Sequence, residues 1–190
     1  MLTNFFTASV AALSLLSAAS AQDLSAVSIR GVTHGGQACP QGSTDFSISA
    51  DKYSITTRYT AFSMSLTSGS FSRKNCQINL DIQYPSGLQY AIVDTTFKDT
   101  ANIQGGTGAR HSVLYYFSGN AEQNTCAKYY SGPMSGDFTY KETISSPVWS
   151  PCGSRLPLNI NNAVVLSSHG DGDAYFNSKV TVSGLIWRDC

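Results

Sequence analysis

Residues 78–92 have the sequence INLDIQYPSGLQYAI. Apolar and polar residues alternate over 78–84 and again over 88–92, on either side of a turn that contains Pro85 and Gly87. Successive side chains of an extended chain point to opposite faces, so each half has one apolar and one polar face. The segment therefore predicts two half-buried strands joined as a β-hairpin.

The same alternation occurs in four other segments, 46–48, 53–55, 62–66 and 180–182. Turn signals rich in Gly, Pro or Asp lie between strands, for example at 68–69, 104–108 and 169–173. No window of a dozen residues has apolar side chains at helical spacing. The sequence therefore predicts an all-β fold, specifically an antiparallel β-sandwich with two stacked sheets and minor helix, in preference to a closed barrel.

The composition excludes several classes of protein. Of 190 residues, 13% are charged and 11% are aromatic, and the 12 basic and 12 acidic side chains give a formal net charge of zero. A nucleic-acid-binding protein needs clustered Lys and Arg, and a disordered chain needs high charge and few aromatic residues. The glycines at 105, 106 and 108 lack the Lys-Ser/Thr ending of a phosphate-binding loop. We therefore expect no nucleic-acid partner and no cofactor.

Residues 1–21 have the features of a secretory signal peptide. They contain no charged side chain, have an apolar stretch around 10–16 and end in Ala19-Ser-Ala21. The apolar stretch is shorter than the ~20 residues needed to cross a bilayer. We expect cleavage after Ala21, a single β-sandwich domain over 22–190, a secreted, extracellular location and no membrane partner.

Export to an oxidising compartment favours disulfides among the five cysteines, which are Cys39, Cys76, Cys126, Cys152 and Cys190. Five choices of free thiol times three pairings of the other four give fifteen arrangements, and spacing alone does not choose among them. Cys152 and Cys190 each end a Trp-x-x-Cys tetrapeptide, and a bridge between them would hold the C-terminus in place. We favour Cys39 with Cys76 and Cys152 with Cys190.

Several longer segments resemble one protein family. They are RKNCQINLDIQYPSGLQYAIVDTTF from Arg73, LYYFSG from Leu114, VWSPCG from Val148, PLNINNAVVLSS from Pro157 and the terminal WRDC. The family is the group of fungal secreted proteins called domain of unknown function 4360, and the resemblance runs from about Ala38 to the last residue. It implies a secreted, disulfide-bonded, β-rich domain of fungal origin, with no assigned activity and no catalytic residues.

The resemblance also bears on the cysteines. Cys39, Cys76, Cys152 and Cys190 match the family pattern, which implies the two bridges favoured above. Cys126 is an addition of this sequence and is expected to be a free thiol. An inert buried thiol, a mixed disulfide and an intermolecular bridge are the alternatives for its state.

Aromatic side chains are the candidates for ligand binding, namely Tyr115, Tyr116, Tyr129, Tyr130 and Trp149. Adjacent residues of a strand point to opposite faces, so at least one ring of each tyrosine pair is expected to point outward. An exposed ring can stack on the apolar face of a sugar while nearby Asn and Asp bind its hydroxyl groups. Packing in the core is the alternative interpretation.

The loop over 169–173 is the candidate metal site, because Asp171 and Asp173 offer two hard oxygen ligands for calcium. It is not a calcium helix-loop-helix, since Tyr175 stands where a third oxygen ligand is needed and Val182 where the closing Glu would fall. A solvated turn is the alternative.

Three functions remain for this chain. We favour a non-enzymatic extracellular module that binds a cell-wall polysaccharide or a host surface molecule. One alternative is an extracellular enzyme that acts on polysaccharides through two carboxylates. Its candidate residues lie on or near predicted strands and are interpreted as solvated, namely Asp81, Asp94, Asp99, Asp137 and Glu142. The other alternative is a secreted protein that contacts a host extracellular protein through a strand edge or an aromatic patch.

Overall fold

The computed structural model describes residues 22–67, 71–152 and 155–190. Its strands are β1 (Ser28–Gly35), β2 (Thr44–Ile48), β3 (Ser54–Tyr59), β4 (Ser63–Leu66), β5 (Phe71–Gln83), β6 (Leu88–Ile103), β7 (Thr107–Phe117), β8 (Gln123–Ser131), β9 (Met134–Thr143), β10 (Leu158–Ser168) and β11 (Ala174–Asp189). The predicted signal peptide, residues 1–21, and the turn signal at 68–69 lie outside the described residues.

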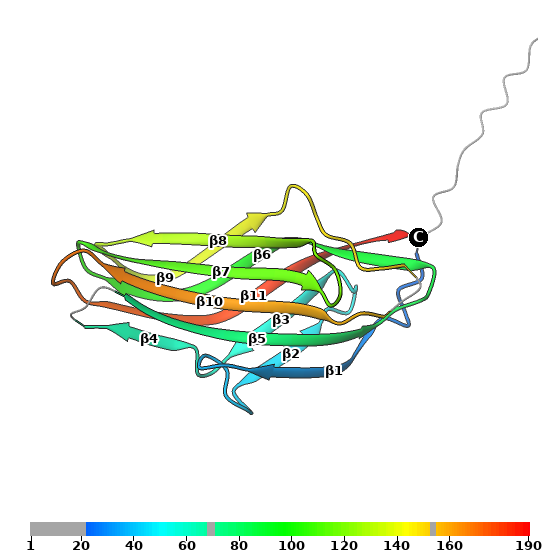
Figure 1. Cartoon of the computed structure of the whole chain (residues 1–190), viewed down its shortest axis with the longest axis horizontal. Helices are drawn as coiled ribbons and strands as arrows, with labels where there is room; N and C mark the ends of the chain where they lie inside the picture. Colours follow the sequence, from blue (N-terminus) through cyan, green and yellow to red (C-terminus); the bar gives the residue numbers. More distant parts are fainter. Residues whose placement is uncertain (1–21, 68–70, 153–154) are drawn as a thin grey trace, which may run out of the picture.

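The strands form two antiparallel sheets packed face to face (Figure 1). Sheet A has the order β1-β5-β10-β7-β8, and sheet B has the order β2-β3-β11-β6-β9, with β4 also paired to β11. The predicted all-β sandwich is confirmed. The described residues contain no helix, so the predicted minor helix is not found among them. Accordingly, no described helix is long and apolar enough to cross a membrane.

The predicted hairpin at 78–92 is wrong, although both of its strands exist. β5 pairs with β1 and β10 in sheet A, whereas β6 pairs with β11 and β9 in sheet B. The turn closes through a hydrogen bond from the Leu88 amide to the Pro85 carbonyl at 3.1 Å. The turn thus carries the chain from one sheet to the other. Alternation predicts that each strand buries one face, but it does not determine which strand lies alongside.

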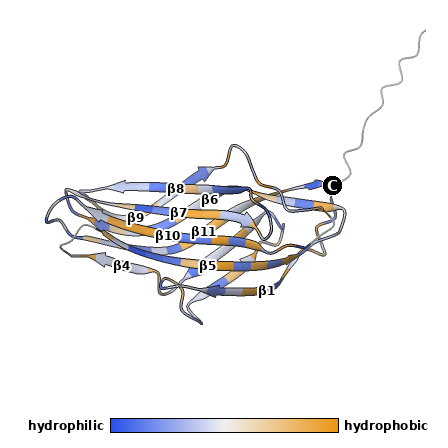
Figure 2. Cartoon of the chain, in the orientation of Figure 1, coloured by the Kyte–Doolittle hydropathy of each residue, from blue (hydrophilic) through white to orange (hydrophobic). Residues whose placement is uncertain are grey.

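The core lies between the sheets and follows the predicted alternation. On β5, the side chains of Ile78 and Leu80 are fully buried, and on β7 those of Val113 and Phe117 are nearly so. Figure 2 shows the resulting change of hydrophobic and hydrophilic residues along the strands. Each buried aliphatic or aromatic side chain of this size contributes about 1.5–3 kcal/mol to folding.

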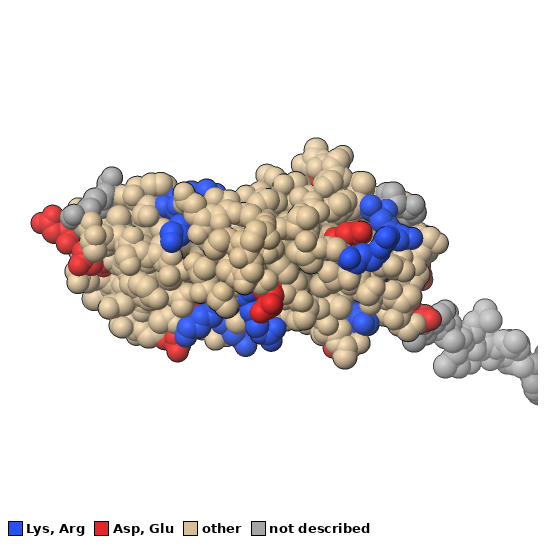
Figure 3. All heavy atoms as spheres, turned by 90° about the horizontal axis from the view of Figure 1, so that it is seen from below, with Lys and Arg blue, Asp and Glu red and all other residues tan. Residues whose placement is uncertain are grey.

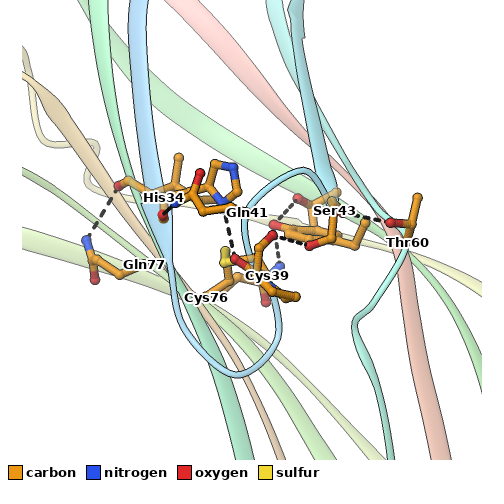
Figure 4. The surroundings of a disulfide bond; sticks show 12 residues. His34, Cys39, Gln41, Ser43, Thr60, Cys76 and Gln77 are labelled. Atoms are coloured by element: carbon orange, nitrogen blue, oxygen red, sulfur yellow. Dashed lines mark hydrogen bonds between the residues drawn. A yellow bond between two sulfur atoms is a disulfide. The ribbon is translucent and has the colours of Figure 1, made fainter.

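The two disulfides have the favoured pairing. Cys39 bonds to Cys76, which ties the loop after β1 to β5, and Cys152 bonds to Cys190, which ties the end of β11 to the segment after β9. Figure 4 shows the first bridge and its neighbours. There His34 donates from Nδ1 to the Cys39 carbonyl at 3.2 Å. Loss of a native bridge from a small secreted domain typically costs about 2–5 kcal/mol.

Cys126 is a free thiol and is fully buried on β8. Burial raises the pKa of this thiol above its ordinary value. A buried, protonated thiol is a poor nucleophile. Of the three alternatives for Cys126, this burial favours the buried thiol.

A polar network crosses the core between the sheets. His111 on β7 and Asp99 on β6 are 0% and 1% exposed, and their Nδ1 and Oδ2 atoms lie 2.9 Å apart. The Tyr130 hydroxyl donates to the same Oδ2 at 2.7 Å. On the other side of the ring, His111 Nε2 lies 2.7 Å from Asn162 Oδ1, and Asn162 Nδ2 donates to the Tyr59 hydroxyl at 2.8 Å. Strands β3 and β6 of sheet B are thus bonded to β7, β8 and β10 of sheet A.

The buried pair gives a prediction about stability. Asp99→Ala should lower the free energy of unfolding by about 3–5 kcal/mol, because it leaves His111 buried without its carboxylate. The double variant Asp99→Leu, His111→Phe should recover most of that loss, since it removes both polar groups together. Urea unfolding of the single variants Asp99→Leu and His111→Phe and of the double variant measures the coupling. Strictly additive effects would contradict a direct interaction.

Candidate functional site

The outer face of sheet A carries an ordered set of uncharged polar side chains. On β5, β7 and β10 the apolar residues of each alternating pair point into the core, so their polar neighbours point outward. The strand registers then align these neighbours in rows across the sheet. Asn79 lies opposite Asn159, and Asn159 lies opposite Tyr116. In the next row Gln77 lies opposite Asn161, and Asn161 lies opposite Leu114.

The amides of these rows are held by one another and by neighbouring hydroxyl groups. Asn79 Nδ2 donates to Asn159 Oδ1 at 3.1 Å, and Asn159 Nδ2 donates to Ser118 Oγ at 2.9 Å. Gln77 Nε2 donates to the Tyr116 hydroxyl at 3.5 Å. Asn161 Oδ1 accepts no hydrogen bond from any described residue, and this oxygen is shielded from solvent. Gln77 and Asn79 are half-buried, so the parts of their fixed amides that reach the surface can bind the hydroxyl groups of a ligand.

One end of this face is hollowed beside β8. The hollow has a volume of about 550 Å³, and its lining includes Arg110, Tyr129, Val165, Ser167 and His169. Tyr129 is 65% exposed and forms one wall. Gly108 of β7 is part of the floor. Any side chain at this position would project outward into the hollow, and its Cβ atom would lie 3.1 Å from the Tyr130 carbonyl oxygen. The glycine therefore keeps this part of the face open.

Arg110 fixes the orientation of the exposed ring. The two residues lie opposite each other on β7 and β8. Arg110 Nε donates to the Tyr129 hydroxyl at 3.0 Å, and its guanidinium carbon lies 5.6 Å from the ring centroid. A second donor, Arg110 Nη1, bonds to Ser112 Oγ at 3.1 Å. An aromatic ring that is both exposed and held in place loses little entropy when a ligand stacks on it.

A second hollow of about 380 Å³ lies on the other side of β8, between β8 and β9. Lys128 points into this opening, and its Nζ lies 4.2 Å from the centroid of the Tyr140 ring. The Tyr140 hydroxyl donates to Glu142 at 2.5 Å, and this bond raises the pKa of that hydroxyl. Tyr129 lines both hollows and so forms the ridge between them.

The five aromatic residues predicted to bind a ligand do not lie together. Tyr116 and Tyr129 point outward on sheet A, as described above. Tyr115 and Tyr130 are only 3% and 4% exposed, so they are core residues and not surface ligands. One ring of each tyrosine pair points outward, as predicted. The prediction that Tyr115 and Tyr130 also bind a ligand is wrong, because both rings are buried. Trp149 lies apart from the face, pairs with Ala91 of β6 and is covered by the Arg188 guanidinium at 3.8 Å.

The polar tips of the buried tyrosines explain why such residues are tolerated in the core. The Tyr115 hydroxyl bonds to Thr95 and Ser183, each at 2.7 Å. These contacts join β7 of sheet A to β6 and β11 of sheet B. A buried tyrosine normally needs such a partner for its hydroxyl group. Adjacent tyrosines in the sequence gave no signal for which ring would be buried.

The predicted metal ligands occupy the turn before β11. The Asp173 amide donates to Gln104 Oε1 at 3.1 Å, and its carbonyl accepts from the Gln104 amide at 3.0 Å. These bonds tie the turn to the loop between β6 and β7. Among the residues that the structure describes, no three His, Cys, Asp or Glu side chains are grouped to hold a metal. A calcium site at Asp171 and Asp173 therefore stays a prediction without further ligands.

The five candidate carboxylates do not share a site. Asp81 is on the outer face of sheet A opposite Gly31, and Asp99 is buried in the core. The other three have separate partners: Asp94 pairs with Lys141, Asp137 pairs with Lys179, and Glu142 accepts a hydrogen bond from Tyr140. The interpretation of all five as solvated is wrong for Asp99. The sequence does indicate that Asp99 is buried, since Phe97, Asp99 and Ala101 share one face of an alternating strand.

Sequence reasoning missed the amide rows and Arg110. The alternating amides at 75, 77 and 79 and at 159 and 161 are visible in the sequence. Their assembly into one surface depends on β5 and β10 being neighbours, although their paired residues Asn79 and Asn159 are 80 positions apart. Short-range periodicity does not contain that information.

Comparison with known proteins places the chain in a family. The family model for a domain of unknown function, DUF4360, matches residues 25–190. The chain belongs to the DUF4360 family. An uncharacterized secreted protein of Arthroderma benhamiae is 34% identical over 153 residues, which are 78% of this chain and 62% of that protein. This relative bears out the prediction of a secreted protein. The chain thus spans less than two thirds of the relative's length.

Two solved structures show weak likeness to this DUF4360 protein. One is TmCBM61 in complex with β-1,4-galactotriose, with a TM-score of 0.31, 9% identity and coverage of 85% of this chain and 90% of that chain. The other is the CBM22-1 and GH10 modules of a Clostridium thermocellum xylanase complexed with xylohexaose, with a TM-score of 0.30, 13% identity and coverage of 64% and 26%. These scores are low, and neither likeness bears on what the present chain binds.

The buried tyrosines predict the response to alkaline pH. Burial raises the pKa of Tyr59, Tyr90 and Tyr115, and burial together with the charge of Asp99 raises the pKa of Tyr130. Because the folded-state pKa lies above the unfolded value of about 10, these groups stabilise the fold fully below that pH and progressively less above it.

An alkaline titration that follows tyrosinate absorbance and circular dichroism together tests this prediction. We expect part of the absorbance change from the ten tyrosines to appear only when the protein unfolds. Ionisation of all ten tyrosines in a protein that stays folded would show that these four are not buried.

Proposed function

We propose that this chain is a non-enzymatic secreted module that binds a polysaccharide through the outer face of sheet A. The observation that carries the proposal is the combination on one surface of fixed amide rows, the exposed Tyr129 ring and the hollow beside it. These features come from three neighbouring strands, β10, β7 and β8, together with β5. A face assembled in this way is rigid before the ligand arrives.

Sugars fit the chemistry of this face. Each sugar hydroxyl both donates and accepts hydrogen bonds, and each Asn or Gln side chain does the same. The C–H face of a sugar ring is apolar and stacks on a flat aromatic ring such as Tyr129. The face extends over many residues in each strand, which is suited to several linked sugar units and not to a single one. A polysaccharide is therefore the ligand class that we favour.

The arrangement of charges also supports binding in preference to hydrolysis. The described lining of the hollow includes no Asp or Glu, so no pair of carboxylates faces a ligand bound there. On the side of the molecule shown in Figure 3, Lys and Arg lie in separate groups, some of them beside Asp or Glu, and form no continuous basic stripe. That distribution does not resemble the surface of a nucleic-acid-binding protein.

A protein partner that adds a strand to β8 is less well supported. Lys128 lies on this edge strand with its side chain directed into the opening between the sheets. Charges that point inward at a sheet edge protect it from pairing with another chain.

Depletion of the protein from solution by insoluble chitin, β-glucan, cellulose and pectic material tests the proposal. We expect selective depletion by one of these polymers. Tyr129→Ala should then weaken binding about tenfold, because loss of a stacking ring costs about 1–1.5 kcal/mol. Tyr175→Ala is the matched control, since Tyr175 is 39% exposed but lies on β11 of sheet B. Depletion by no polymer, or equal losses in the two variants, would overturn the proposal.

A further inference from the structure

We propose that the hollow beside Tyr129 binds the carboxylate of an acidic sugar, so that the polysaccharide is polyanionic and of the uronic-acid type. This inference rests on the proposed function and specifies the chemical class of the polysaccharide. It starts from the charges that line the two hollows next to β8. The first hollow is lined by Arg110 and His169, and the second by Lys128. Neither described lining includes Asp or Glu.

This local excess of basic groups is not a property of the whole chain, whose formal net charge is zero. The other charged residues near this end do not neutralise the hollow. Asp171 and Asp173 follow His169 in the same loop, but neither lines the hollow, and Asp173 lines a separate groove beside Tyr175. Asp81 lies toward the opposite end of the face, eight residues from Arg73 along β5.

Arg110 has a charge that the protein itself does not neutralise. Its Nε and Nη1 atoms bond to the hydroxyl groups of Tyr129 and Ser112, which are neutral partners. Within 22–67, 71–152 and 155–190, Arg110 forms no ion pair with a carboxylate. The two neutral bonds fix the plane of the guanidinium and leave its Nη2 atom available. Held in this way, Nη2 can donate a charge-assisted hydrogen bond to a carboxylate oxygen of a ligand, and the fixed positive charge of the guanidinium attracts the rest of that carboxylate.

A second arginine lies in the same row of the face. Val165 of β10 pairs with Arg73 on one side and with Arg110 on the other. Two strand spacings separate the arginine Cα atoms by about 10 Å. Arg73 donates from Nη1 to Asn75 Oδ1 at 3.1 Å, which is again a neutral partner. Two unneutralised arginines in one row favour a polymer with repeated negative charges over a ligand with a single charge.

The test compares polygalacturonate with its methyl ester, because the two polymers share a backbone and differ in charge. We expect the protein to bind polygalacturonate and to lose at least tenfold in affinity for the ester, since the charge-assisted bonds to Arg110 are absent. Binding should also weaken as the salt concentration rises from about 0.05 to about 0.5 M, because salt screens exposed charges.

Two arginine variants locate the effect. Arg110→Gln keeps a group that can hydrogen-bond and should weaken binding to polygalacturonate at least tenfold. Arg58→Gln is the matched control, since Arg58 is exposed on β3 of sheet B, and it should change binding less than twofold. Unchanged thermal unfolding of both variants shows that the fold is intact.

The outcomes separate this inference from the proposed function. Equal binding of the acid and the ester, tight binding only to a neutral polymer, or full binding by Arg110→Gln would overturn the acidic-sugar inference while the polysaccharide face stands. Binding to none of the polymers would overturn both.

Discussion

The interaction between Asp99 and His111 is the constraint on which the arrangement of the two sheets depends. Both side chains lie in the core among aromatic rings, with the centroids of Phe97, Phe176 and Phe62 at 4.6, 5.7 and 6.2 Å from that of the His111 ring. A carboxylate in such surroundings is costly unless it is hydrogen-bonded. Because its partners come from the opposite sheet, the bonds form only when the sheets stack in one particular alignment.

That constraint reaches the proposed binding face through the alternation of the strands. His111 points inward from β7, so its neighbours Arg110 and Ser112 point outward. Asn162 points inward from β10, so Asn161 points outward in the same way. The network that fixes β7 and β10 from inside therefore also fixes the side chains that a ligand would meet. The buried polar groups stabilise the fold and the outward ones line the proposed binding face, and β7 and β10 carry residues of both kinds.

The sequence determined much of this structure in advance, but not its long-range pairing. Alternation correctly predicted strands and their buried faces. The predicted secretion, together with the resemblance to the family, predicted the pairing of both disulfides. The turn at Pro85 was interpreted as a hairpin because local alternation cannot show that β5 and β6 belong to different sheets. Outward alternation of polar residues predicts a solvated Asp99, but this residue alternates in phase with Phe97 and is buried with it. The candidate face needed the register of β5 against β10, which only the folded chain supplies.

The central claim is that the outer face of sheet A is a binding surface, and side-chain amide NMR tests it most directly. The protein, labelled with nitrogen-15, is titrated with soluble oligosaccharides of chitin, β-glucan, cellulose and pectic galacturonate. We expect one oligosaccharide to shift the side-chain amide signals of Gln77, Asn79, Asn159 and Asn161, while that of Asn102, on β6 of sheet B, does not move. Shifts confined to sheet B, or no shift with any oligosaccharide, would contradict it.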